Sequence, residues 1–182
     1  MAGLLYYRTT GYKMNSALRM SSEPIQLRRG KAFHRLIQAE WKNEAEGRIN
    51  TEHHIIKPNG RRGRVDVFVN DEEPDGVVAI VEVKATDWDK IKAQNVRRNI
   101  RRQIRQIWNY IESQILNGQF ILTGEGKDVC PGIIFPKRPK SQKRMALIEE
   151  LFLEEGIPVV WHDETIEECK LRHGAKIRTG CD

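Results

Sequence analysis

Apolar positions recur with a helical period in some segments and with the alternating period of a strand in others. Each change between the two periods marks the boundary of a predicted element. Residues 1–28 show neither period, which predicts a loosely ordered arm. Residues 31–46 carry apolar side chains at helical spacing between two glycines, Gly30 and Gly47, and predict a first helix. A second, longer helix is predicted over residues 90–116, where isoleucines recur every three or four positions.

Alternating apolar positions predict a strand on each side of a Pro-Asn-Gly turn within residues 51–69. In the second of these strands the valines share one face and leave Asp66 on the other. After an acidic turn, residues 77–85 form a nearly continuous apolar run that carries Glu82 and Lys84 on one face, and such a run is typical of a central strand. The midpoint between Asp66 and Glu82 falls inside the turn. A simple hairpin therefore sets the two carboxylates opposite one another or one diagonal step apart.

Shorter segments complete the pattern. Residues 132–135 and 157–162 predict strands, a helix is predicted inside residues 141–156, and the end of the chain predicts a short helix and a frayed terminus. The resulting order, αβββαβαβ, indicates one α/β domain with a central mixed sheet flanked by helices. The predicted parts are an N-terminal arm at 1–28, the domain at 29–165 and a C-terminal tail at 166–182.

The composition agrees with a polar globular domain and excludes several other classes. Of the 182 residues 39% are hydrophobic and 31% charged, with no apolar run of membrane-spanning length and no signal-peptide core near the start. Three cysteines are too few for a disulfide framework, so we expect a reducing cytoplasm, of the producing cell or of a target cell into which the protein is delivered. The net charge of +6 favours a polyanionic partner.

Asp66, Glu82 and Lys84 are charged residues at positions expected to be buried, where an unpaired charge costs on the order of several kcal/mol. Two explanations are open. Lys84 could form a structural ion pair with one of the carboxylates. Alternatively, the two carboxylates supply the hard oxygen ligands that Mg²⁺ prefers, and the lysine positions a water molecule and offsets charge that develops on a phosphate.

The arrangement of Asp66 on one strand and Glu82-Val83-Lys84 on the next resembles the PD-(D/E)XK, or restriction-endonuclease-like, nuclease superfamily. The resemblance spans residues 30–161, and the predicted order of elements agrees with the core of that family. A valine precedes Asp66 where the name-giving proline would stand, a departure that is frequent in the superfamily. The resemblance implies a magnesium- or manganese-dependent nuclease in which Asp66, Glu82 and the Val83 carbonyl bind metal and Lys84 activates water.

Two further motifs are similar to those of the RecB-type nucleases within this superfamily. His34 follows a glycine with the Gly-x-x-x-His spacing of that subgroup, in which the histidine helps to bind metal. Glu40 and Glu44 remain competing ligands on the same helix, because many members use a glutamate there. Gln106 and Tyr110 match a Gln-x-x-x-Tyr motif, and their spacing projects both from one helical face. The resemblance implies that these two residues orient the substrate or the catalytic lysine.

Arginines gather on the long helix in two parallel rows with four-residue spacing, an arrangement that can follow a phosphate backbone without reading bases. They are Arg97, Arg98, Arg101, Arg102 and Arg105. These rows favour a nucleic acid as the partner, and the resemblance implies DNA as the substrate, cut by an endonuclease of a toxin, phage or restriction type. RNA, including transfer RNA, remains open as the substrate, and so does a nuclease-fold protein that binds nucleic acid without cutting it. The helix could also contact an immunity protein or a second copy of the chain.

Overall fold

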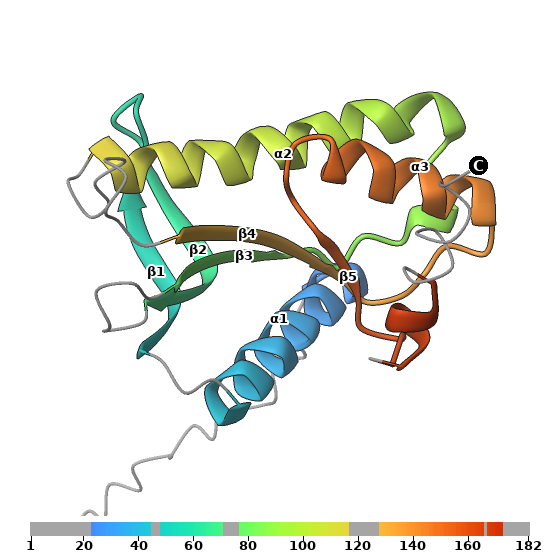
Figure 1. Cartoon of the computed structure of the whole chain (residues 1–182), viewed down its shortest axis with the longest axis horizontal. Helices are drawn as coiled ribbons and strands as arrows, with labels where there is room; N and C mark the ends of the chain where they lie inside the picture. The colour runs from blue at the N-terminus through green and yellow to red at the C-terminus, as the bar shows by residue number, and fades with distance from the viewer. Residues whose placement is uncertain (1–22, 45–47, 71–76, 117–127, 166, 173–182) are drawn as a thin grey trace, which may run out of the picture.

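The computed structural model describes residues 23–44, 48–70, 77–116, 128–165 and 167–172. Within these ranges the chain forms three longer α-helices, five strands and one short 3-10 helix, followed by a short helix at residues 167–172 (Figure 1). In chain order these are α1 (Ile25–Glu44), β1 (Arg48–Ile56), β2 (Arg62–Asn70), β3 (Val77–Val83), η1 (Trp88–Lys90), α2 (Ala93–Leu116), β4 (Asp128–Phe135), α3 (Gln142–Leu153) and β5 (Val159–Trp161).

The five strands form one mixed sheet in the order β1-β2-β3-β4-β5. The β1–β2 and β2–β3 pairs are antiparallel, whereas β4 pairs in parallel with both β3 and β5. Parallel neighbouring strands need a crossover connection. Helix α2 lies in the connection from β3 to β4, and α3 lies in the connection from β4 to β5. The predicted α/β class with a central mixed sheet flanked by helices is therefore confirmed.

Helices cover the sheet on both faces, with α2 and α3 on one side and α1 on the other (Figure 1). The larger apolar core joins the isoleucine stripe of α2, including Ile100 and Ile107, to Ile80 of β3. A smaller core joins Phe33 and Ile37 of α1 to valines of β2 and β3. Both faces of β3 are thus covered, which is why its sequence is almost continuously apolar.

The first helix begins earlier than the sequence pattern predicts. It starts at Ile25 rather than at residue 31, because the main-chain N–H groups of Leu27 and Arg28 bond to the Pro24 carbonyl and begin the helical ladder. Gly30 consequently lies inside the helix and is not its boundary. A Cβ atom at this position would stand 3.7 Å from the Cβ of Ala85, so the glycine marks where α1 approaches the chain just after β3. Residues 25–28 of the predicted arm are helical, while residues 1–22 lie outside the described part of the chain.

Two other boundaries also differ from the prediction. Helix α2 begins at Ala93 rather than at residue 90, because the Asp87 side chain caps the separate turn η1. Strand β4 begins at Asp128 rather than at residue 132, since it pairs with the whole length of β3. Pro131 fits into this strand because β5 pairs only with the last three residues of β4.

Residues 167–172 form the short helix predicted near the C-terminus, and this helix is fixed to the domain. Thr165 and Glu168 exchange side-chain to main-chain hydrogen bonds of 3.2 and 3.0 Å at its start, which form a capping box. Arg172 at its end is ion-paired with Glu149 of α3 and with Glu164. These ion pairs join residues 167–172, which fall within the predicted C-terminal tail, to α3 and to Glu164. Residues 173–182 lie outside the described part.

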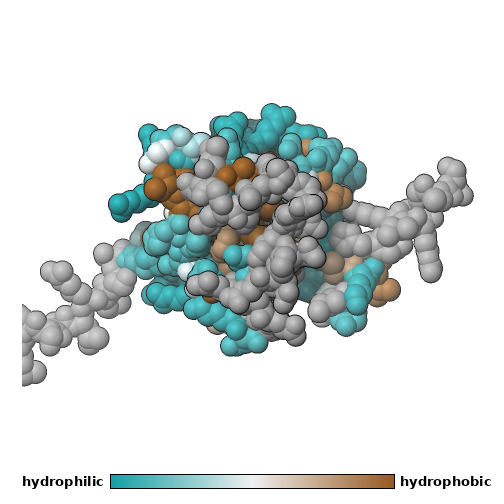
Figure 2. All heavy atoms as spheres, turned by 60° about the vertical axis from the view of Figure 1, so that its left-hand side comes forward, coloured by the Kyte–Doolittle hydropathy of each residue, from teal (hydrophilic) through white to brown (hydrophobic). Residues whose placement is uncertain are grey.

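The surface is mainly hydrophilic where Figure 2 draws it in colour, with smaller hydrophobic patches between the polar side chains. Exposed apolar side chains include Leu27 and Leu36 on α1 and Trp108 on α2. Among the described residues, none of the helices has the length and apolar character needed to cross a membrane.

Candidate active site

The two acidic strand residues meet where the β2–β3 ladder ends. Strand pairing runs from Asn70 opposite Val78 to Val67 opposite Val81, and one further step in this register sets Asp66 opposite Glu82. At that step a side chain takes the place of a main-chain partner, because Oδ2 of Asp66 accepts a hydrogen bond of 2.9 Å from the Val83 N–H. The register bears out the hairpin expectation that the two carboxylates face one another.

Asp66, Glu82 and Lys84 form a cluster of charged side chains, which we call the carboxylate cluster. Glu82 is its most deeply buried member, with 3% of its surface exposed. Its Oε1 accepts hydrogen bonds from the Lys84 ammonium and, at 2.6 Å, from Nε2 of Gln106. Its Oε2 is buried and has no hydrogen-bond partner among the described residues. The pKa of Glu82 is raised to about 7, first by burial and then by the nearby Asp66 charge, and Lys84 opposes both effects. Glu82 is thus a carboxylate with one oxygen left for another ligand.

Helix α1 contacts the same cluster through His34 and Gln38. Nδ1 of His34 lies 3.2 Å from Oδ1 of Asp66, and the His34 side chain is partly exposed. Gln38, one helical turn further on, donates a 3.1 Å hydrogen bond to the Asp66 carbonyl. The two residues share a face of α1 because they are four apart, and together they hold the helix against the centre of β2.

Helix α2 contacts the cluster from the opposite face of the sheet. Nε2 of Gln106 lies 2.6 Å from Oε1 of Glu82 and 2.6 Å from the Tyr110 hydroxyl. It therefore joins Tyr110, the other residue of the Gln-x-x-x-Tyr motif, to the Glu82 carboxylate. Tyr110 is 3% exposed, and burial together with the Glu82 charge raises its pKa to about 12. It therefore remains a neutral phenol. The Lys57 ammonium lies 5.3 Å from the centre of its ring, a cation–π distance.

The competing ligands on α1 differ in where they lie. Both carboxylate oxygens of Glu40 are 3.2 Å from Nε2 of His162, which follows β5. The Glu40 carboxylate is thus paired with His162, whereas His34 contacts Asp66 directly. The side chain of Glu44 lies outside the described part. Of the first-helix candidates, His34 is the one that the described geometry joins to the carboxylates.

The five arginines of α2 are all exposed on the side of the helix away from its isoleucine stripe. With Gln94 they line a shallow groove of about 490 Å³. Arg98 and Arg102 donate hydrogen bonds to the amide oxygens of Asn95 and Asn99, and the described residues provide no carboxylate partner for any of the five arginines. The groove is separate from the carboxylate cluster and carries concentrated positive charge.

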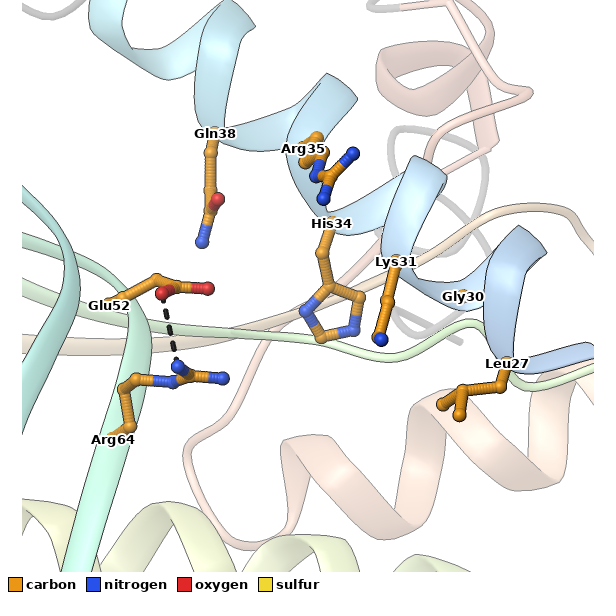
Figure 3. A pocket seen from close by; sticks show the side chains of 8 residues that line it. All are labelled: Leu27, Gly30, Lys31, His34, Arg35, Gln38, Glu52 and Arg64. Atoms are coloured by element: carbon orange, nitrogen blue, oxygen red, sulfur yellow. Dashed lines mark hydrogen bonds and ion pairs between the residues drawn. The ribbon is translucent and has the colours of Figure 1, made fainter. Parts of the chain in front are cut away.

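A cleft of about 420 Å³ adjoins the cluster between α1 and the strands β1 and β2 (Figure 3). His34 belongs to both the cleft and the cluster, as does Gln38 through its bond to the Asp66 carbonyl. The sequence analysis missed this cleft and its remaining lining residues, which are Leu27, Gly30, Lys31, Arg35, Glu52 and Arg64. Helical spacing from His34 indicates Lys31 and Gln38, but only the fold brings β1 and β2 into position opposite them.

The chemistry of the cluster suits a divalent cation. Asp66 and Glu82 supply carboxylate oxygens, one of which is buried without a partner, and His34 adds an imidazole beside them. In the described arrangement these groups bond to one another and to Lys84, Gln106 and Val83. No group of three or more His, Cys, Asp or Glu side chains within the described ranges is already arranged as a metal site.

Comparisons with known proteins assign no family to the chain. No family model matches it, and no curated protein matches its sequence.

Proposed function

We propose that the protein is a metal-dependent phosphodiesterase that cuts DNA. The observation that carries this proposal is the state of Glu82. A carboxylate that is 3% exposed lies opposite a second carboxylate, has a raised pKa and leaves one buried oxygen without a partner. A divalent cation would compensate both negative charges and bind that oxygen, whereas the Lys84–Glu82 ion pair alone leaves the oxygen unbonded.

Asp66, Glu82 and His34 would hold Mg²⁺ or Mn²⁺, with the Val83 carbonyl as a further ligand suggested by the family resemblance. When bound, the cation would polarise the phosphate and lower the pKa of a coordinated water molecule. Lys84 is suited to orient the attacking water and to stabilise negative charge on phosphate oxygens, because its ammonium lies at the Glu82 carboxylate and its side chain is 24% exposed. Gln106 holds Glu82 in place, and Tyr110 positions Gln106.

Two larger features support a nucleic acid as the substrate. The order from α1 to β4 is αβββαβ, which agrees with the restriction-endonuclease-like core. The arginine groove of α2 offers five guanidinium groups without a carboxylate partner among the described residues, which suit phosphate contacts and predict strong dependence on salt. Compact basic members of the superfamily that the chain resembles often serve as toxin, phage or restriction nucleases, and we extend the proposal to a nuclease of this type.

The proposal is tested by incubating the purified protein with supercoiled plasmid and, separately, with transfer RNA, in Mg²⁺, Mn²⁺ or EDTA. Lys84→Ala removes the proposed water-orienting group, and we expect plasmid nicking to fall by about a hundredfold or more. Lys143→Ala is the matched control, since it removes an exposed lysine on α3.

Each outcome has a distinct meaning. Nicking that requires the metal and Lys84 would support the proposal. Cleavage restricted to RNA would retain the site and change the substrate. Binding of both polymers without cleavage in either metal would contradict the enzyme and favour a non-catalytic nucleic-acid-binding protein.

A further inference from the structure

The cleft beside His34 is lined by more positive than negative charge. Lys31 and Arg35 of α1 and Arg64 of β2 stand around it with one carboxylate, that of Glu52. In Figure 3 Lys31 and His34 extend from the helix toward the strands that carry Glu52 and Arg64. A volume of about 420 Å³ is in the range of small-ligand sites, so the cleft has room for one unit of a larger chain.

Arg64 is bonded to an anion that can be exchanged. Its Nη1 lies 3.1 Å from Oε2 of Glu52, and the two side chains are 53% and 48% exposed. An ion pair in contact with water contributes little to stability and is readily broken. A phosphate group can accept two parallel hydrogen bonds from the same guanidinium, which is a stronger contact than the single bond to Glu52.

The backbone of Glu52 is itself unusual. Its φ angle is 59°, and it is the one non-glycine with positive φ among the residues that the structure describes. Thr51 and His53 pair with β2 on either side, but Glu52, which the register sets opposite Asp66, interrupts the ladder. Left-handed backbone is unfavourable for a residue with a side chain and is found most often at functional sites. Here it accompanies a carboxylate that lines the cleft and occupies Arg64.

We propose that this cleft binds the nucleotide unit next to the scissile phosphate, with its phosphate on Arg64 and Lys31, and that Glu52 occupies Arg64 until a nucleic-acid strand replaces it. The proposal rests on the proposed nuclease function for its substrate. His34 joins the two sites, since it lines the cleft and contacts Asp66. Lys31 is likewise paired with a carboxylate, at 2.5 Å from Glu23, so the strand would displace carboxylates at two positions.

The test measures binding of a short, labelled single-stranded DNA in EDTA, where no metal-dependent cleavage occurs, at salt concentrations between about 50 and 200 mM. We expect Arg64→Ala to weaken binding about fivefold to tenfold and to reduce the salt slope by about 0.7, the value for one lost phosphate contact with a single strand. Arg62→Ala is the matched control, because Arg62 is an exposed arginine on the same strand that lines a different hollow. It should change the affinity less than about twofold.

The direction of the affinity change in Glu52→Gln is the more decisive result. Removing the competing carboxylate should tighten DNA binding about twofold to fivefold, whereas a purely structural ion pair predicts unchanged or weaker binding. Equal effects of Arg64→Ala and Arg62→Ala, or no gain with Glu52→Gln, would overturn the proposal. Arg64-dependent binding of millimolar inorganic phosphate, with an oligonucleotide affinity that Arg64→Ala leaves unchanged, would also overturn it, in favour of a site for free phosphate.

Cleavage of plasmid in Mg²⁺ is measured in parallel, so that the two proposals fail separately. Normal metal-dependent cleavage by wild-type protein with no effect of Arg64→Ala on binding would overturn the cleft and leave the nuclease. Absent cleavage together with the expected changes at Arg64 and Glu52 would support the cleft as a nucleic-acid site and overturn the nuclease.

Discussion

Glu82 is the central residue of the candidate site. It is held in a buried position, and this burial makes its charged form less favourable. Burial is the largest cause of its raised pKa, and the facing Asp66 adds to it. Lys84 and Gln106 both bond to one oxygen, and the other has no hydrogen-bond partner within the described part of the chain. A carboxylate in this condition favours either a proton or a cation, and pH decides between the two.

Stability without metal should therefore fall as the pH rises. The folded protein binds the Glu82 proton more tightly than the unfolded chain, with a pKa of about 7 against the ordinary value of 4.5. The stabilising contribution is complete below pH 4.5 and is lost as the pH rises through 7. Its full size is on the order of 3 kcal/mol.

Thermal unfolding in EDTA between pH 5 and 8.5 should show an unfolding temperature that declines more steeply for the wild type than for Glu82→Gln. Parallel curves for these two proteins would contradict the assignment, and Glu150→Gln, an exposed site on α3, is the control.

Added metal should reverse this trend. Mg²⁺ or Mn²⁺ must replace the Glu82 proton, so the rise in unfolding temperature on adding metal should be larger at pH 8 than at pH 5.5. At a metal concentration one hundred times the dissociation constant the gain is about 2.7 kcal/mol. Differential scanning fluorimetry of the wild type, Asp66→Asn and Glu150→Gln checks this. Equal shifts in all three proteins would mean that the metal binds elsewhere.

At the scale of single elements, α2 carries two groups of polar side chains on different faces, the exposed arginines and the pair of Gln106 and Tyr110. Arg98, Arg102, Gln106 and Tyr110 follow one another at four-residue spacing, so one ridge of the helix leads from the exposed arginines to the residues that hold Glu82. Successive side chains on this ridge are roughly 6 Å apart along the axis. The second row, which contains Arg97 and Arg101, lies further around the helix from Gln106. The two rows carry similar charge, but only the row of Arg98 and Arg102 lies in line with Gln106 and Tyr110.

A comparison of the two rows tests whether the ridge guides a strand to the carboxylates. We expect Arg98→Gln/Arg102→Gln to weaken DNA binding about tenfold and to reduce the salt slope by about 1.4 to 1.8, according to whether the DNA is single- or double-stranded. Arg97→Gln/Arg101→Gln removes the same charge from the same helix and should have a smaller effect. Anisotropy titrations across the salt range measure both. Equal losses would show that α2 attracts DNA through its net charge and does not set its path.

For the whole molecule, the sequence predicts what depends on local period and register. The α/β class, the order of the elements and the facing of Asp66 and Glu82 all follow from apolar spacing and the length of one turn. The start of α1 and the burial of residues 167–172 do not, since they depend on Pro24 and on ion pairs with distant partners. The cleft is missed for the same reason, because Arg64 and Lys31 are brought together by tertiary packing and not by any spacing in the chain.

The C-terminal helix shows how such distant contacts close the domain. Arg172 is ion-paired with Glu149 and Glu164, whose side chains are 8% and 3% exposed, and Glu149 also accepts a 2.8 Å hydrogen bond from the indole of Trp161 in β5. Removing the guanidinium would leave two buried carboxylates with less compensation, so Arg172→Ala should lower the free energy of unfolding by about 3 kcal/mol. Lys170→Ala, on the same short helix but exposed, should change it by less than about 0.5 kcal/mol. Urea unfolding measures both variants. If Arg172→Ala were as stable as Lys170→Ala, residues 167–172 would be an appendage of the domain, as the sequence pattern first suggests, and the fold would close at β5.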